Sequence, residues 1–253
     1  MFRYWFQASH ILIICIEVIR LHQNIFTVSS YIRKLIAQGE HQQQDFKFEI
    51  SDSKKIARSL AAFSNTDGGK LLVGVKDNGV IAGVRSEEEF YMVEAAAQMY
   101  CRPEVHFKMK EWVIDGKAVL EVDIPKNVAD RPFSAPDKEG KWMAYIRVND
   151  QNLLANTVLL KVWRMSKRQK GITIRYTDKE KILLDFLDKH GEVTLTKFRK
   201  IAGISRYVAE KVLADLITLK IIDMEITEKS VVYRTNAKFE EAFSPDEHHK
   251  SQF

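Results

Sequence analysis

The strongest constraint on the fold is the segment 61–79, where a helix end, a tight turn, a short strand and a hairpin follow one another. Three apolar residues at helical spacing predict a helix over residues 53–65: Ile56, Leu60 and Phe63. Asn65 and the Gly68-Gly69 pair tolerate positive φ and end that helix. The apolar run 71–75 predicts a strand, and Asn78-Gly79 predicts a hairpin. Such a turn lets backbone approach backbone or a phosphate closely, and it places Asp77 at a strand end, where a carboxylate can point into a cleft.

The neighbouring segments predict a domain of the α+β class. Further strands are expected at residues 44–50, 80–84 and 142–148, and further helices at residues 30–38 and from the Ser86-Glu87-Glu88-Glu89 capping box to about residue 100. Alternating apolar residues around the Asp115-Gly116 turn predict an antiparallel hairpin with one buried face. Because strands and helices do not alternate strictly, we expect a mixed or antiparallel sheet.

The C-terminal part predicts a small helical domain that ends in a hairpin. A capping box at Thr177–Glu180 begins a first helix, and Gly191 ends it. A second helix is expected at residues 195–202, followed by the Gly203-Ile204 turn and a third helix capped by Ser205. Strands at residues 221–226 and 231–235 complete a hairpin. Three helices and a terminal hairpin in about 60 residues resemble a winged helix-turn-helix.

In such a domain the third helix enters the major groove of DNA by its N-terminal half. The positions expected to be exposed there are Ser205, Arg206, Tyr207 and Glu210. Phosphate contacts are expected from the second helix and the hairpin: Lys197, Arg199, Lys200 and Lys229. Winged helices also serve as protein–protein or dimerisation modules, so a protein-binding role and a homodimer stay open as alternatives.

Basic residues are concentrated in one part of the chain. Residues 161–211 hold 14 Lys and Arg against 6 Asp and Glu, whereas the formal net charge of all 253 residues is +5. Residues 161–175 alone hold six basic residues and no acidic one. That segment is either a solvated helix and linker or a phosphate-contact surface. The two cysteines, Cys15 and Cys101, have no metal-ligand spacing and predict no disulfide framework, which favours a cytoplasmic location.

Three consecutive segments resemble the Schlafen/AlbA-like domain of bacterial proteins: Asn65-Thr66-Asp67-Gly68-Gly69, Leu71-Leu72-Val73-Gly74-Val75 and Asp77-Asn78-Gly79. Asp45-Phe46-Lys47 and Tyr145-Ile146-Arg147-Val148 fit the same family, so the resemblance covers residues 30–165. Together with the winged helix, it implies a bacterial DNA-binding transcriptional regulator that acts without catalysis. Duplex DNA is then the expected partner, and RNA is the alternative.

The resemblance also implies site residues. Schlafen-type ribonucleases use three acids in similar places, which would make Glu40, Asp45 and Asp77 ligands of Mg²⁺ or Mn²⁺ in a metal-dependent endoribonuclease. Lys47 and Arg147 would then contact nucleic acid. Asp45 stands where Glu is commoner, and the same acids could be surface carboxylates without a catalytic role. No cofactor is expected outside the nuclease alternative.

Some members of the family have been labelled ATP-binding. The turn residues that could cradle a phosphate are Asn65, Thr66, Gly68 and Gly69. Because the chain has no Walker lysine-serine pattern, ATP hydrolysis is not expected.

The expected organisation has five parts: an N-terminal extension (1–28), the Schlafen/AlbA-like domain (29–165), a basic linker (166–175), the winged helix-turn-helix (176–238) and a disordered tail (239–253). The apolar run 11–16 is too short to span a bilayer, so no membrane partner is expected. The run is interpreted as part of a non-native extension, a packing helix or a targeting segment. We expect residues 1–28 to be dispensable.

Overall fold

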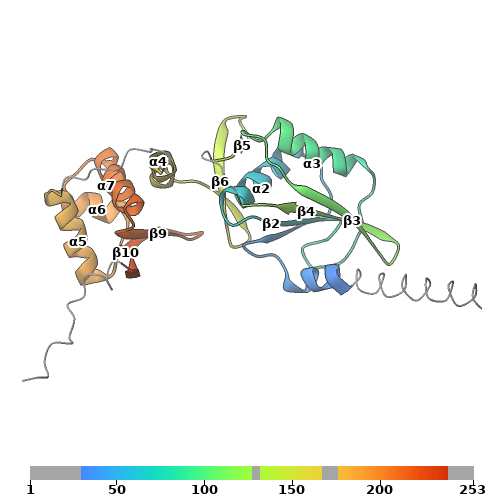
Figure 1. The fold of residues 1–253 in the computed structure, drawn as a ribbon, viewed down its shortest axis with the longest axis horizontal. Coiled ribbons are helices and arrows are strands. Elements are labelled where there is room, and N and C mark those ends of the chain that lie inside the picture. Colours follow the sequence, from blue (N-terminus) through green and yellow to red (C-terminus); the bar gives the residue numbers. More distant parts are fainter. Residues whose placement is uncertain (1–29, 127–131, 167–175, 239–253) are drawn as a thin grey trace, which may run out of the picture. The chain divides into compact units, whose positions relative to one another are not determined.

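The computed structural model describes residues 30–126, 132–166 and 176–238. The predicted N-terminal extension, the C-terminal tail and nearly all of the predicted linker lie outside these ranges. The chain forms two compact units, which divide between Asn152 and Leu153 (Figure 1). None of the helices in the described ranges combines the length and the apolar character needed to cross a membrane.

The first unit is built on a four-stranded sheet in the order β1-β2-β4-β3. Its strands are β1 (Gln44–Lys47), β2 (Gly69–Val73), β3 (Lys108–Ile114) and β4 (Lys117–Ile124). β1 pairs in parallel with β2, and the other neighbours are antiparallel. The helix α2 (Ser53–Asn65) connects the two parallel strands (Figure 1). The predicted α+β class with a mixed sheet is confirmed.

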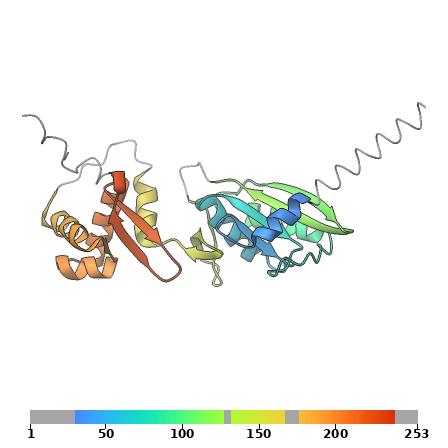
Figure 2. The same cartoon turned by 90° about the horizontal axis from the view of Figure 1, so that it is seen from below.

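Both faces of this sheet are covered (Figures 1 and 2). Leu71 and Val73 of β2 belong to a core shared with α2 and α3 (Glu88–Met99), whereas Leu72 belongs to a second core beneath the helix at residues 30–38. The prediction of a single buried face for the β3–β4 hairpin is therefore wrong, because the helix at residues 30–38 covers the other face.

That second core contains an ionised side chain. Glu121, which is 6% exposed, accepts hydrogen bonds from Tyr31 Oη, Lys70 Nζ and Trp112 Nε1, each at 2.7 Å. Burial alone would raise the pKa of the Glu121 carboxyl, but these three hydrogen bonds hold it below its usual value. The satisfied carboxylate thus ties the helix at residues 30–38 to the sheet.

A second sheet, most of which lies in the first unit, packs against α2. It has the order β5-β6-β7, formed by β5 (Ser134–Pro136), β6 (Trp142–Val148) and β7 (Gln151–Leu154). The strand predicted at residues 142–148 is therefore present, in a sheet of its own. The strand predicted at residues 80–84 is reduced to a single bridge between Val75 and Ile81. Gly79 and Gly83 flank this bridge with φ values of +80° and +86°, which interrupt extended backbone.

The described part of the second unit contains four helices and three short strands. In chain order they are α4 (Thr157–Met165), α5 (Asp178–His190), β8 (Glu192–Val193), α6 (Leu195–Ala202), α7 (Arg206–Thr218), β9 (Ile222–Ile226) and β10 (Val231–Thr235). From α5 onward this is the order predicted from the sequence, with β8 added beside the hairpin. Local sequence fixes the helix ends: Thr177 and Glu180 form the capping box, and Ser205 Oγ accepts the N–H of Val208.

Helix α4 packs in the second unit. Val158, which is 1% exposed, lies in one core with Leu183, Phe198 and Leu213 of α5, α6 and α7. The units therefore divide earlier than the boundary predicted at residue 165. The reason is that α4 contributes its apolar face to a core whose other members follow much later in the chain.

Candidate functional site

The turn at residues 65–69 is held by the protein's own groups. The side-chain amide of Asn65 donates to the carbonyl oxygens of Phe133 and Tyr145, both at 2.8 Å, and its Oδ1 accepts the N–H of Phe133 at 2.8 Å. Thr66 Oγ1 accepts the backbone N–H of Arg147 at 2.9 Å. These side chains join the end of α2 to the second sheet, which leaves them little capacity to bind a ligand.

Packing also explains the two glycines of this turn. A Cβ on Gly68, whose φ is +71°, would lie 2.7 Å from the carbonyl oxygen of Ile124. A Cβ on Gly69 would lie 2.5 Å from the ring of Phe63. The glycines make room for neighbouring backbone and an aromatic ring. The phosphate cradle predicted at Asn65, Thr66, Gly68 and Gly69 stays a prediction.

Two of the three predicted acids come together. Asp45 on β1 is 3% exposed. The pKa of Glu40 is raised, mainly because this carboxyl is partly buried and also because it shares a hydrogen bond with Asp45. Glu40 Oε1 also accepts the N–H of Phe46 at 2.9 Å. Asp77 is exposed in the segment after β2. Within the part of the chain that the structure describes, no three His, Cys, Asp or Glu side chains are grouped so that they could hold a metal ion. The predicted three-acid metal site is therefore not assembled.

Asp45 faces a buried cation. Arg147 is 2% exposed; its Nη2 lies 3.3 Å from Asp45 Oδ1 and donates to the carbonyl oxygen of Gln44 at 3.2 Å, while its Nη1 donates to Asn152 Oδ1 at 3.1 Å. The prediction that Arg147 contacts nucleic acid is wrong, because this guanidinium is enclosed and engaged by the protein. Lys47 Nζ, 2.8 Å from Asp45 Oδ2, belongs to a side chain that is 35% exposed and stays accessible.

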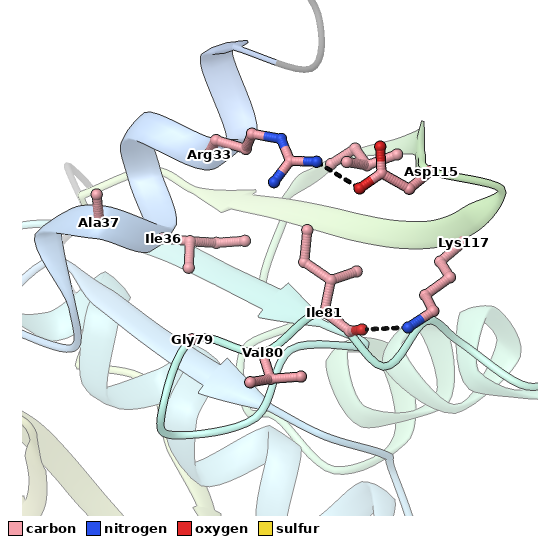
Figure 3. Close-up of a pocket in the computed structure, with 9 residues that line it drawn as sticks. Arg33, Ile36, Ala37, Gly79, Val80, Ile81, Asp115 and Lys117 are labelled. Carbon is pink, nitrogen blue, oxygen red and sulfur yellow. Dashed lines mark hydrogen bonds and ion pairs between the residues drawn. The ribbon is translucent and has the colours of Figure 1, made fainter.

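A surface pocket of about 410 Å³ lies beside the helix at residues 30–38 (Figure 3). Its apolar wall includes Ile36 and Ile81, and its rim carries an ion pair between Arg33 and Asp115. Lys117 Nζ donates to the carbonyl oxygen of Ile81 at 2.9 Å. The three charged side chains at this pocket are thus engaged within the protein, and none of the predicted site residues lines it.

Most of the contact residues predicted in the second unit are exposed. These are Lys197 and Lys200 on α6, Ser205 just before α7, Arg206 and Tyr207 in its first turn, and Lys229 between β9 and β10. The Arg206 side chain is 64% exposed and Tyr207 is 70% exposed. Arg199 differs, because it is half-buried and its Nε has no hydrogen-bond partner among the described residues. The start of α7 therefore presents a cation and an aromatic ring to solvent.

Glu210 was predicted to be exposed and is buried, with 6% of its surface accessible. Its Oε1 accepts hydrogen bonds from Arg206 Nε at 2.8 Å and Thr157 Oγ1 at 2.6 Å, and its Oε2 accepts from Lys161 Nζ at 2.9 Å. Burial alone would raise the pKa of the Glu210 carboxyl, but these three donors lower it to about 2. Sequence reasoning missed this group because Thr157 and Lys161 lie on α4; only the four-residue spacing from Arg206 to Glu210 indicated an ion pair.

We expect the free energy of unfolding to depend less on pH in the acid range when Glu210 is replaced by Gln. The folded-state pKa of about 2 lies below the unfolded value of about 4.3, so the carboxylate stabilises the fold above that value and loses its contribution as the pH falls towards 2. The contribution is of order 3 kcal/mol, and about half of it should disappear between pH 5 and pH 3. Urea unfolding of wild type and Glu210→Gln at pH 5 and pH 3 measures the difference between their free energies of unfolding, which should be smaller at pH 3. An equal difference at both pH values would contradict the stabilising role of the ionised Glu210 carboxylate.

The fold and these contacts define a two-unit α+β protein with a buried Asp45–Arg147 pair in one unit and an exposed cation and aromatic ring on the other. Residues 40–156 match the model of the Schlafen, AlbA_2 family. The resemblance given by the residue 65–79 segment is thereby confirmed. The family match ends at the residue before α4 begins.

Two solved structures are similar to this chain. The DIP2311 protein from Corynebacterium diphtheriae is 16% identical with a TM-score of 0.38, over 60% of this chain and 36% of that chain. The N-terminal domain of a RecG-related protein from Nitrosomonas europaea is 18% identical with a TM-score of 0.35, over 59% of this chain and 97% of that one. The match thus spans about a third of the length of the Corynebacterium protein. No curated protein matches the sequence.

Proposed function

We propose that this chain is a nucleic-acid-binding protein whose second unit binds duplex DNA, and that it acts as a bacterial transcriptional regulator without a catalytic step. The observation that carries the proposal is the exposed pair Arg206 and Tyr207 in the first turn of α7, the third helix in the winged helix-turn-helix order that begins at α5. In such domains that end of the helix enters the major groove, where an arginine reads guanine or holds a phosphate.

The charge of the second unit supports this proposal. Residues 161–211 carry 14 basic and 6 acidic side chains, and one of the acids, Glu210, is buried against cations. Lys197, Lys200 and Lys229 are exposed on α6 and the hairpin, the elements that contact backbone phosphates in winged helices. A local excess of positive charge of this kind favours a polyanion as the partner.

The first unit supports nucleic acid as the ligand through its family, since the Schlafen/AlbA resemblance implies nucleic-acid binding. The ribonuclease alternative would require Asp77 to share an ion with Glu40 and Asp45. Among the described residues, these three acids do not form a group that could hold a metal ion. The proposal therefore rests on the binding surface of the second unit.

We expect Arg206→Ala to weaken duplex binding by on the order of 1–3 kcal/mol if the guanidinium reads a base edge, because that bidentate contact is lost. Fluorescence anisotropy with a duplex selected from host DNA by the purified protein measures the loss. Lys179→Ala is the matched control, since it removes one exposed charge from the first turn of α5.

Equal affinities of wild type and Arg206→Ala would remove α7 from base readout. Failure of the wild type to retain any duplex at low salt, where phosphate contacts are strongest, would refute DNA binding itself.

A further inference from the structure

The guanidinium of Arg206 is held by one of its three nitrogens. Its Nε donates to Glu210 Oε1 at 2.8 Å, and neither Nη group makes a hydrogen bond within the described part of the chain. A guanidinium is a planar fork whose two Nη groups match the oxygens of a phosphate or the acceptor edge of guanine. The bond to Glu210 fixes the plane of the fork and leaves its outer donors open to solvent.

A second cation reaches the same place from a different helix. Lys161 of α4 donates to Glu210 Oε2 at 2.9 Å, and its Nζ lies 4.6 Å from the centre of the Tyr207 ring. Its side chain is 21% exposed, so the ammonium group is held at the margin of the surface. Lys161, Arg206 and Tyr207 are therefore linked around one buried carboxylate; we call these three residues the α4–α7 surface.

We infer that Glu210 is a positioning residue for this surface, and that α4 supplies a phosphate contact, Lys161, to the binding of duplex nucleic acid. The inference rests on the proposed function and extends it to a helix outside the helix-turn-helix. Side chains already ordered in the free protein lose less conformational entropy on binding, so fixing two long cationic side chains favours affinity. The charges of Lys161, Arg206 and Glu210 sum to +1, which keeps the surface attractive to a phosphate backbone.

Replacing Lys161 tests the contribution of α4. Lys161→Met keeps an unbranched apolar stem and removes the ammonium group. Binding of a fluorescein-labelled mixed-sequence duplex of about 20 base pairs is measured at several salt concentrations. Loss of one phosphate contact should reduce the slope of log K against log salt by about 1 and weaken binding about threefold to tenfold at low salt. Lys179→Met on α5 is the matched control and should leave both quantities unchanged.

A double-mutant cycle tests the positioning role of Glu210. Glu210→Gln removes the charge at nearly constant shape, and we expect it to weaken binding of the same duplex about fivefold in the wild-type background. In the Arg206→Ala background the same change should cost less than twofold, because the side chain that Glu210 orients is gone. A purely structural role would reduce the melting temperature in both backgrounds without this coupling, so circular dichroism melts accompany each measurement.

The possible outcomes are separable. Coupling between Glu210 and Arg206, together with the smaller salt slope of Lys161→Met, supports the inference. Tighter binding by Glu210→Gln would overturn it, because the carboxylate would then act as a repulsive charge. If wild type binds and Arg206→Ala weakens binding while Lys161→Met changes nothing, the role of α4 fails and the proposed function survives. If wild type does not bind duplex, the proposed function itself fails.

Discussion

Arg147→Ala should lower the free energy of unfolding of the first unit by about 3–5 kcal/mol, the range found when one partner of a buried ion pair is removed. The guanidinium is 2% exposed and contacts Asp45, Gln44 and Asn152, and its Cζ lies 4.9 Å from the centre of the Phe63 ring. Its removal leaves the Asp45 carboxylate buried with Lys47 as its remaining cation. Urea unfolding of the full chain measures the change.

The matched control is Lys126→Ala. Lys126 Nζ lies 3.1 Å from Asp67 Oδ1, but the two side chains are 62% and 48% exposed, so this pair should contribute less than about 1 kcal/mol. Equal losses of unfolding free energy in Arg147→Ala and Lys126→Ala would show that the buried guanidinium does not stabilise the first unit more than an exposed ion pair does. A loss of duplex affinity at unchanged stability would restore Arg147 as a ligand contact.

Gly68→Ala should be nearly as damaging. The residue has a φ of +71°, and its new methyl group would lie 2.7 Å from the carbonyl oxygen of Ile124 and 2.8 Å from the amide nitrogen of Lys126. Both neighbours are backbone atoms, which cannot move aside as a side chain could. Strain at positive φ costs roughly 1–2 kcal/mol, and overpacking adds roughly 1–3 kcal/mol. The expected loss is therefore about 3 kcal/mol or more, measured by urea unfolding.

Gly116 offers a close control for this experiment. Its φ is +75°, and a Cβ built on it meets no heavy atom within 4 Å. Gly116→Ala therefore carries the backbone strain without the collision. The difference in free energy of unfolding between Gly68→Ala and Gly116→Ala isolates the cost of the collision at the start of β2. Similar urea midpoints for the two variants would mean that the backbone after Ile124 can move to accommodate the methyl group.

The features predicted best from the sequence are those that depend on residues close together in the chain, such as the ends of helices. The helix expected at residues 53–65 occupies Ser53–Asn65, and the capping box at Thr177 and Glu180 is formed. These ends depend on side chains that bond to backbone within one turn. Apolar alternation likewise located β4, but it did not reveal that Glu121 is buried, because Tyr31 comes from a helix 90 positions away.

The candidate site was predicted less well for the same reason. Arg147 was expected at the surface, yet its carboxylate partner, Asp45, lies 102 positions earlier in the chain. Glu210 was expected to be exposed, yet its donor Lys161 lies 49 positions earlier. A charged residue is expected at the surface when only its sequence is known. Its burial depends on a partner of opposite charge that lies far away in the chain, and a local sequence pattern does not show that partner. Arg206 and Tyr207 were placed well because their exposure depends on the start of one helix.

The membership of α4 in the second unit determines where this protein could be cut and rejoined by gene fusion. The basic segment after Met165 has the composition of a linker and would be the obvious joint. A recombinant that began there would lack Val158 and Lys161, and Glu210 would lose two of its three donors. The match to the family ends at residue 156, immediately before Thr157. The unit that carries α7 thus begins at α4, one helix before α5.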